Sequence, residues 1–193
     1  MRGKTYIVAH RRRREGKTDY RQRLRLMKSG KPRFVVRKSL NNVTCQIIEY
    51  SPDGDRTLVS VNSGDIAKLG WKGHSGNLPS AYLTGLLCGT KAGKMKVKQA
   101  VLDAGLYIST PASRIYAALK GALDAGLEIP HSEEILPKEE RIRGEHIAAF
   151  AGKLKSENPD EYRKRFSAYL RNKILPETIP KHFDEVRKKI VKK

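Results

Sequence analysis

Alternating apolar and polar positions are the clearest signal in the first third of the chain. A β-rich centre at 34–36 predicts a strand over 33–38, and a similar alternation predicts a second strand over 43–51. The Pro-Asp-Gly-Asp turn at 52–55 separates this strand from a third one over 56–62. Because short turns join all three strands, the sequence predicts an antiparallel meander.

Helical periodicity marks most of the remaining chain. Tyr20, Leu24 and Met27 recur at i, i+4 and i+7, which predicts a short helix over 18–29 with Thr18 as its N-cap. We expect the apolar stripe of this helix to face inward and its cations to face outward. Further segments are predicted as a helix over 79–92 after a Gly-rich loop over 66–77, a strand over 100–108, and helices over 110–126, 141–156, 160–175 and 183–191.

This order of elements predicts an α/β fold. Helices would pack on a mixed sheet that consists of the antiparallel meander and one parallel strand. We expect three regions, namely a basic N-terminal arm over 1–17, an α/β core over 18–130 and a helical C-terminal extension over 131–193. The sequence contains no internal repeat that would predict a solenoid.

Positive charge is concentrated at the two ends of the chain. Residues 1–38 carry a net charge of +13, residues 39–150 are neutral and residues 151–193 carry +7, which accounts for the total of +20. Arg outnumbers Lys in the first segment, and Arg both pairs with phosphate through two parallel hydrogen bonds and stacks on bases. Because this charge continues from the arm into the first predicted helix and strand, we expect a nucleic-acid partner rather than a solvating tail.

Composition indicates the size of the core and the cellular compartment of the protein. With 38% apolar and 31% charged residues, 193 residues can bury one moderate core. No apolar run approaches the roughly 18 residues of a membrane span, and Ile7, Val8 and Ala9 are too few for a secretory signal. Cys45 and Cys88 are far apart and fit no metal-binding spacing. We therefore expect a reducing, cytoplasmic setting without a disulfide, a membrane or a small-molecule substrate.

Catalytic motifs are not assembled in the sequence. Gly16, Lys17 and Thr18 resemble the end of a phosphate-binding loop, but Arg11 stands where that loop needs its first Gly. The histidines are scattered without a metal-binding pattern, at positions His10, His74, His131, His146 and His182. A metal-dependent nuclease remains an alternative because Asp103 lies on a strand predicted to be central, although two-metal chemistry needs several converging carboxylates. We therefore expect a protein that is not an enzyme and holds no cofactor or metal.

Trp71 has two interpretations. It lies between Gly70 and Gly73, with Lys72 and His74 beside it. It could pack against the edge of the core, or it could present its ring to nucleic acid from a flexible loop. We expect the nucleic-acid contact, with core packing as the alternative.

Several motifs together resemble one known family. They are RRRREGKTDYR at 11–21, LRLMKSGKPRFVVRKS at 24–39, LGWKG at 69–73, AYLTGLL at 81–87, VLDAGL at 101–106, ALDAGLEIPH at 122–131 and RGEHIA at 143–148. The combination closely resembles the large-subunit ribosomal protein L18 family in its archaeal form, which corresponds to the eukaryotic L5 type. The resemblance spans roughly residues 5–150.

This resemblance implies a structural protein of the large ribosomal subunit. Family members bind 5S rRNA and attach it to 23S rRNA in the central protuberance, beside the other 5S-binding ribosomal proteins, and have no known catalytic role there. A DNA-compacting basic protein remains a further alternative. Sequence and resemblance together predict RNA contacts at Arg11, Arg12, Arg13, Arg14, Lys17, Arg21, Arg23, Arg25, Lys28, Lys31, Arg33, Arg37, Lys38, Trp71, Lys72, His74, Lys91 and Lys94.

Overall fold

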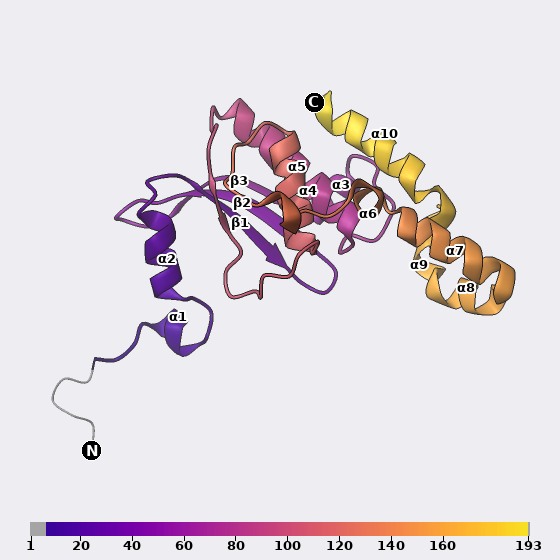
Figure 1. Cartoon of the computed structure of the whole chain (residues 1–193), viewed down its shortest axis with the longest axis horizontal. Helices are drawn as coiled ribbons and strands as arrows, with labels where there is room; N and C mark the ends of the chain where they lie inside the picture. The colour runs from indigo at the N-terminus through magenta and orange to yellow at the C-terminus, as the bar shows by residue number, and fades with distance from the viewer. Residues whose placement is uncertain (1–6, 193) are drawn as a thin grey trace, which may run out of the picture.

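The sheet forms from the alternating segments of the sequence. The computed structural model describes residues 7–192. Its strands are β1 (Arg33–Lys38), β2 (Val43–Glu49), β3 (Arg56–Asn62) and β4 (Val101–Asp103). They lie in the order β3-β2-β1-β4, with β1–β2 and β2–β3 antiparallel and β1–β4 parallel (Figure 1). This confirms the predicted α/β fold, the meander and the single parallel strand.

Strand β4 is much shorter than the predicted strand over 100–108. It ends at Asp103, because the chain turns at Gly105, whose φ of +64° favours glycine. The Asp103 carboxylate accepts a hydrogen bond from the Gly105 N–H at 2.9 Å and so stabilises this turn. The prediction that Asp103 lies on a central strand was also wrong, because β4 is an edge strand beside β1.

The two faces of the sheet differ in chemistry. Successive side chains of a strand alternate between faces. Phe34 and Val36 of β1 lie in the main hydrophobic core and are 0% exposed. Arg33, Val35 and Arg37 lie on the opposite face, which we call the open face. The sequence of β1 therefore places apolar side chains on the core face of the sheet and arginines on its open face.

Helices α3 (Ser63–Ala67), α4 (Leu78–Lys94) and α5 (Arg114–Asp124) cover the core face. Helices α4 and α5 approach each other so closely that a Cβ at Gly85 would lie 1.9 Å from the Ala118 carbonyl oxygen. A Cβ at Gly121 would lie 2.1 Å from the Tyr82 carbonyl oxygen, so glycine is required on both helices. Two predicted boundaries were wrong, because α3 occupies the start of the predicted 66–77 loop and α5 begins at Arg114 rather than Thr110.

Further helices, several of them short, follow α5. They are η1 (Glu133–Ile135), α6 (Glu139–Arg143), α7 (Glu145–Glu157), α8 (Pro159–Arg165), α9 (Ser167–Arg171), η2 (Pro176–Thr178) and α10 (Ile179–Val191). The predicted helix over 141–156 is divided because Gly144 adopts a left-handed φ of +83° between α6 and α7. The predicted helix over 160–175 is likewise divided at Phe166, between α8 and α9.

The last helix packs back onto the core. Ile179, Phe183, Val186 and Ile190 recur along α10, are all 0% exposed and belong to the same hydrophobic cluster as the strands and α4. Helices α7 and α8 form a smaller cluster of their own and lie at the end of the molecule opposite the N-terminal segment (Figure 1). The core boundary at residue 131 stays a prediction, with apolar packing on both sides of it.

Candidate nucleic-acid interface

The N-terminal segment folds into two short helices, α1 (Arg11–Arg14) and α2 (Tyr20–Met27). The N-cap of α2 is Asp19, whose carboxylate accepts hydrogen bonds from the N–H groups of Arg21 and Gln22 at 2.8 and 3.2 Å. The predicted N-cap, Thr18, instead accepts a hydrogen bond from Arg12 Nε at 2.9 Å. The cap prediction was therefore wrong by one residue.

Helix α2 does not bury an apolar stripe. None of its residues is buried, and Leu24, predicted to face inward, is 53% exposed. Gln22, Arg23 and Leu26 face the sheet instead and line a groove against its open face. The assignment of the helix faces from Tyr20, Leu24 and Met27 was wrong because the surface opposite α2 is polar, so apolar periodicity does not select the inward side.

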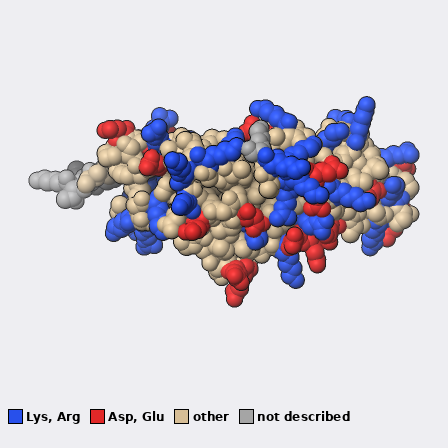
Figure 2. All heavy atoms as spheres, turned by 90° about the horizontal axis from the view of Figure 1, so that it is seen from above, with Lys and Arg blue, Asp and Glu red and all other residues tan. Residues whose placement is uncertain are grey.

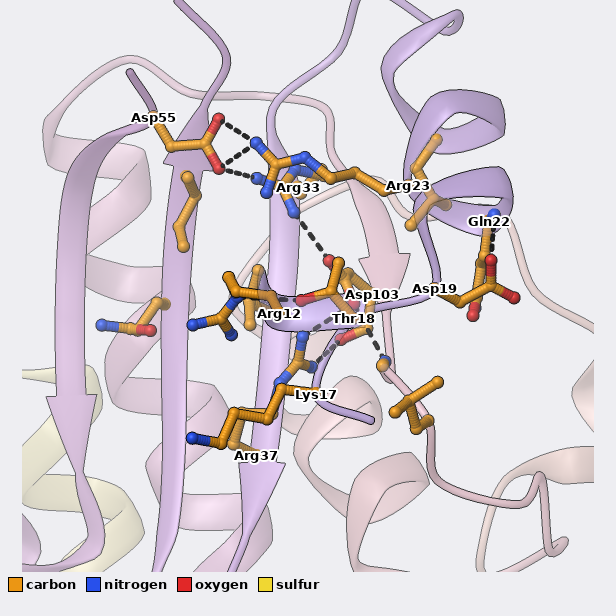
Figure 3. Close-up of a pocket in the computed structure, with 16 residues that line it drawn as sticks. Arg12, Lys17, Thr18, Asp19, Gln22, Arg23, Arg33, Arg37, Asp55 and Asp103 are labelled. Atoms are coloured by element: carbon orange, nitrogen blue, oxygen red, sulfur yellow. Dashed lines mark hydrogen bonds and ion pairs between the residues drawn. The ribbon is translucent and has the colours of Figure 1, made fainter. Parts of the chain in front are cut away.

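The groove between α2 and the open face has a volume of about 420 Å³ (Figure 3). Its walls come from the α1–α2 segment, the open face of β1 and β2, the turn before β3 and the end of β4. Five of the predicted RNA-contacting cations meet here, and the structure places them at Arg12, Lys17, Arg23, Arg33 and Arg37. Segments distant in the sequence thus form one cationic groove.

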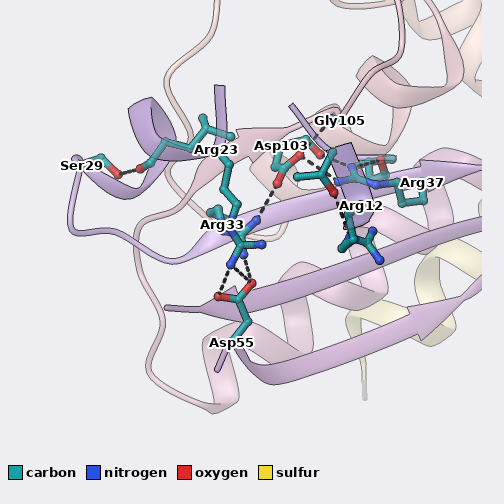
Figure 4. A network of polar contacts seen from close by, with 11 residues as sticks. Arg12, Arg23, Ser29, Arg33, Arg37, Asp55, Asp103 and Gly105 are labelled. Atoms are coloured by element: carbon teal, nitrogen blue, oxygen red, sulfur yellow. Dashed lines mark hydrogen bonds and ion pairs between the residues drawn. The ribbon is translucent and has the colours of Figure 1, made fainter. Parts of the chain in front are cut away.

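A chain of charged groups crosses the groove (Figure 4). Arg23 Nη2 donates to both carboxylate oxygens of Asp55 at 2.9 Å, and Arg33 Nη2 donates to the same carboxylate at 2.5 Å. Arg33 Nη1 also donates to Asp103 at 2.8 Å. Arg37 Nη2 donates to the other oxygen of Asp103 at 3.0 Å. Three arginines therefore share two carboxylates, from helix α2 to the edge strand β4.

Arg33 bridges the two carboxylates inside this network and is not a contact to RNA. It is 5% exposed, and its guanidinium bridges Asp55 and Asp103. The prediction of Arg33 as an RNA ligand is corrected, because only 5% of the residue is exposed and its terminal nitrogens already bind the carboxylates of Asp55 and Asp103. Arg23 and Arg37 keep 31% and 42% of their side-chain surface exposed and remain open to a ligand.

The charge of Asp103 is favoured by its surroundings. Burial alone would raise the pKa of Asp103, but the positive charge of Arg37 lowers it. Hydrogen bonds from Arg37, Arg33 and the Gly105 N–H add to this effect and hold the pKa of Asp103 below its ordinary value. Asp103 is therefore ionised at neutral pH and balances the buried Arg33.

The cations in the described part of the predicted arm are exposed to solvent. Arg11, Arg12, Arg13 and Arg14 form α1 and are all exposed. Glu15 accepts from Arg11 Nε at 2.8 Å and lies 2.9 Å from Lys17 Nζ, and these two partners lower the pKa of Glu15. Arg21, Arg25, Lys28 and Lys31 are also exposed, on or just after α2. Apart from Arg12 and Lys17, which line the groove, these arginines and lysines form a second layer of positive charge outside it.

Trp71 is part of the core. Its side chain is 3% exposed, and its ring stacks on His182 of α10 with 5.2 Å between ring centroids. The expected RNA contact of Trp71 was therefore wrong, and the packing interpretation is confirmed. Its neighbours Lys72 and His74 are exposed, and Lys72 N–H donates to His182 Nε2 at 3.1 Å.

The remaining predicted residues lie away from the groove. Lys38, at the end of β1, lies over the ring of Tyr107 with Nζ 5.2 Å from its centroid. Lys91 and Lys94 are exposed in the last turn of α4. None of these three lysines lines the groove.

The helix predicted over 183–191 contributes to a second cationic surface on α10, although none of its lysines was predicted as an RNA contact. The exposed cations are Lys181, Lys188 and Lys189 on the helix and Lys192 at its C-cap, and none of them forms an ion pair with another residue in the range 7–192. Figure 2 shows Lys and Arg gathered along the half of the molecule that carries the C-terminal helices. The signal was available, because the apolar stripe of α10 already predicted which side faces outward.

The carboxylates of the groove do not form a metal centre. Asp55 and Asp103 each bind Arg33, so an arginine occupies the space where a nuclease would hold cations. Within residues 7–192 no group of three or more His, Cys, Asp or Glu side chains is suited to a metal ion. In the same range no helix is long and apolar enough to cross a bilayer.

The fold and the groove define an α/β protein with a large cationic surface of the kind that binds nucleic acid. The chain matches the family model for ribosomal large subunit proteins 60S L5 and 50S L18 over residues 4–98 and 89–132. The chain therefore belongs to this family, and it is a protein of the large ribosomal subunit that binds rRNA. Proteins of this family are generally not enzymes and work in the cytoplasmic ribosome.

Proposed function

We propose that this protein binds 5S rRNA and helps attach it to 23S rRNA in the central protuberance, beside the neighbouring 5S-binding proteins. The observation that carries the proposal is the groove, in which Arg12, Lys17, Arg23 and Arg37 converge from separate segments. Family membership supplies the class of ligand, because the family consists of large-subunit ribosomal proteins. The resemblance of the motifs supplies the particular RNA.

The groove suits a folded RNA backbone. Arg23 and Arg37 are oriented by carboxylates and keep part of their surface exposed, so each can donate to a phosphate. The exposed arm beside the groove can follow the backbone further, since Arg11 to Arg14 lie on one short helix. Contacts of this type recognise RNA mainly by shape, through phosphates and 2′-hydroxyl groups.

The lysines of α10 suit a second RNA segment. Helix α10 and helix α2 lie at different parts of the molecule (Figure 1). One surface can therefore hold 5S rRNA while the other neutralises phosphates of 23S rRNA. Lys188, Lys189 and Lys192 form no ion pair with a described residue and provide charge without a fixed hydrogen-bond geometry, which suits contacts to the RNA backbone.

Binding of the full chain to 5S rRNA, tRNA and duplex DNA at moderate salt tests the proposal. We expect tighter binding to 5S rRNA than to tRNA, which controls for a compact RNA of similar charge density. Affinity for 5S rRNA should fall by about 10³ or more between 50 and 200 mM salt if about six to ten phosphates are contacted, by analogy with DNA. Equal affinity for all three nucleic acids would contradict the proposal.

A further inference from the structure

Two carboxylates lie among the cations of the groove. Asp55 and Asp103 reduce the positive charge of a surface proposed to bind a polyanion. Charge alone gives no reason for acidic residues at this place, since each one repels phosphate. Their contacts provide a reason, because both carboxylates bind arginines of the groove.

Asp55 connects helix α2 to the sheet. Helix α2 has no buried residue that could fix its position by packing. Within residues 7–192, the ion pair between Arg23 and Asp55 is the one polar contact from an α2 side chain to the sheet and its turns. Both oxygens of Asp55 accept from Arg23 Nη2, so the contact restrains the arginine as well as the helix.

Asp103 restrains Arg37 in the same way. Arg37 Nη1 donates to the backbone carbonyls of Val36 and Asp103, and Nη2 donates to the Asp103 carboxylate. One hydrogen of Nη2 and the Nε–H of Arg37 remain without a partner among the described residues. Arg23 likewise uses only Nη2 and keeps Nη1 and Nε. Each arginine is therefore fixed on one edge and open on the other.

We infer that Asp55 and Asp103 are positioning residues of the RNA interface, which hold Arg23 and Arg37 so that their open edges can bind an RNA phosphate. The inference rests on the proposed function. Arg33 completes the arrangement, because it bridges the two carboxylates and transmits the position of one to the other. An arginine that is fixed before binding loses less conformational entropy when RNA arrives.

A positioning role for Asp55 and simple electrostatics predict opposite effects on RNA affinity when the carboxylate is removed. Replacing Asp55 with Asn raises the net charge by one and removes a repulsive group from the groove. If long-range charge governs binding, affinity should rise. If Asp55 positions Arg23 and α2, the affinity of the variant should fall, because Arg23 and α2 then lose conformational entropy when RNA binds.

Asp53 supplies a matched control. It lies in the same turn, is exposed and forms no hydrogen bond or ion pair with the described residues. Asp53→Asn therefore makes the same charge change without releasing Arg23. We expect Asp55→Asn to weaken 5S rRNA binding about fivefold to tenfold, which corresponds to one or two side chains that must be ordered on binding. We expect Asp53→Asn to leave affinity within about twofold or to strengthen it slightly.

The experiment uses the full chain, with thermal unfolding of each variant as a check that the fold is retained at the assay temperature. Asp55→Glu provides a rescue, since it restores a carboxylate for Arg23. Affinity of Asp55→Asn equal to or above that of Asp53→Asn would overturn the inference alone. A wild-type chain that does not prefer 5S rRNA would contradict the proposed function, and the inference would fall with it.

Discussion

The two basic helices α2 and α10 are attached to the core by different forces. Helix α2 buries no residue and is tied to the sheet through Arg23 and Asp55. Helix α10 buries Ile179, Phe183, Val186 and Ile190 completely in the main core. The cations of the first helix are mostly arginines, whereas the exposed cations of the second are lysines.

In α10, different residues determine the position of the helix and the charge that it presents, whereas in α2 the same residues determine both. Burial of apolar area fixes α10, so its lysines can be exchanged without affecting the position of the helix. Ion pairs fix α2, so the same kind of charge that would bind RNA also determines where the helix lies. We therefore expect α2 to respond to salt, acid and removal of carboxylates, and α10 to respond mainly to changes in its apolar stripe.

The largest effect is expected at Asp103. Asp103→Asn leaves Arg33 buried with one charged partner fewer, so the free energy of unfolding should fall by about 3–5 kcal/mol. Glu185→Gln on α10 makes the same charge change at an exposed site and should cost less than about 0.5 kcal/mol. Urea unfolding of both variants measures the difference. Equal losses would show that the buried network does not carry stability.

Truncation of one apolar side chain on each helix gives the next largest effect. Ile190→Ala removes a fully buried side chain of α10 and should cost about 2–5 kcal/mol. Leu24→Ala on α2 removes a side chain that is 53% exposed and should cost less than about 0.5 kcal/mol. Thermal or urea unfolding checks both values. A large loss for Leu24→Ala would mean that α2 does pack through an apolar face.

The lysines of α10 should affect RNA binding without affecting stability. Replacing Lys188, Lys189 and Lys192 with Gln should lower the slope of log affinity against log salt by about three for a ribosomal RNA fragment that contacts this helix. Arg at the same three positions should keep the slope, because these lysines take part in no ion pair with described residues. An unchanged slope for the Gln variant would exclude α10 from the interface.

Acid should affect helix α10 and the groove network at different pH. Burial lowers the pKa of His182, as do Lys72 and Lys189, although Glu185 opposes them. The unfolded chain then takes up this proton first, so stability is full above about pH 6.5 and declines as pH falls through the lower folded pKa. The pKa of Asp103 is also lowered, so its contribution is lost only below about pH 3.9. Urea unfolding between pH 8 and 3 measures both steps, and the first decline should be smaller in His182→Asn, where His146, whose pKa burial also lowers, still contributes.

Local patterns predicted the sheet well. The strands over 33–38 and 56–62 have the predicted bounds, because alternation and strong turns determine them without reference to distant residues. The split of the predicted 141–156 helix depended on Gly144, which adopts a φ of +83° and where a Cβ would lie 2.9 Å from Ile179 Cγ2. That contact joins distant parts of the chain, so periodicity alone could not show it.

The sequence predicted which cations form the groove but not which carboxylates pair with them. Arg12, Lys17, Arg23 and Arg37 were expected as RNA contacts and meet in one groove. The role of Asp55 was missed because an Asp in a tight turn has a local explanation. Its partner Arg23 lies 32 residues earlier in the sequence, and only the fold brings them together.

Hydrogen exchange of the free protein tests the central claim, that ion pairs rather than packing hold α2, most directly. A helix of eight residues is marginal on its own, so the amides of α2 should be protected only while Arg23 holds Asp55. We predict that protection of α2 falls in Asp55→Asn and at high salt, while protection of α10 stays unchanged in both conditions. Protection of α2 that survives both changes would contradict the account.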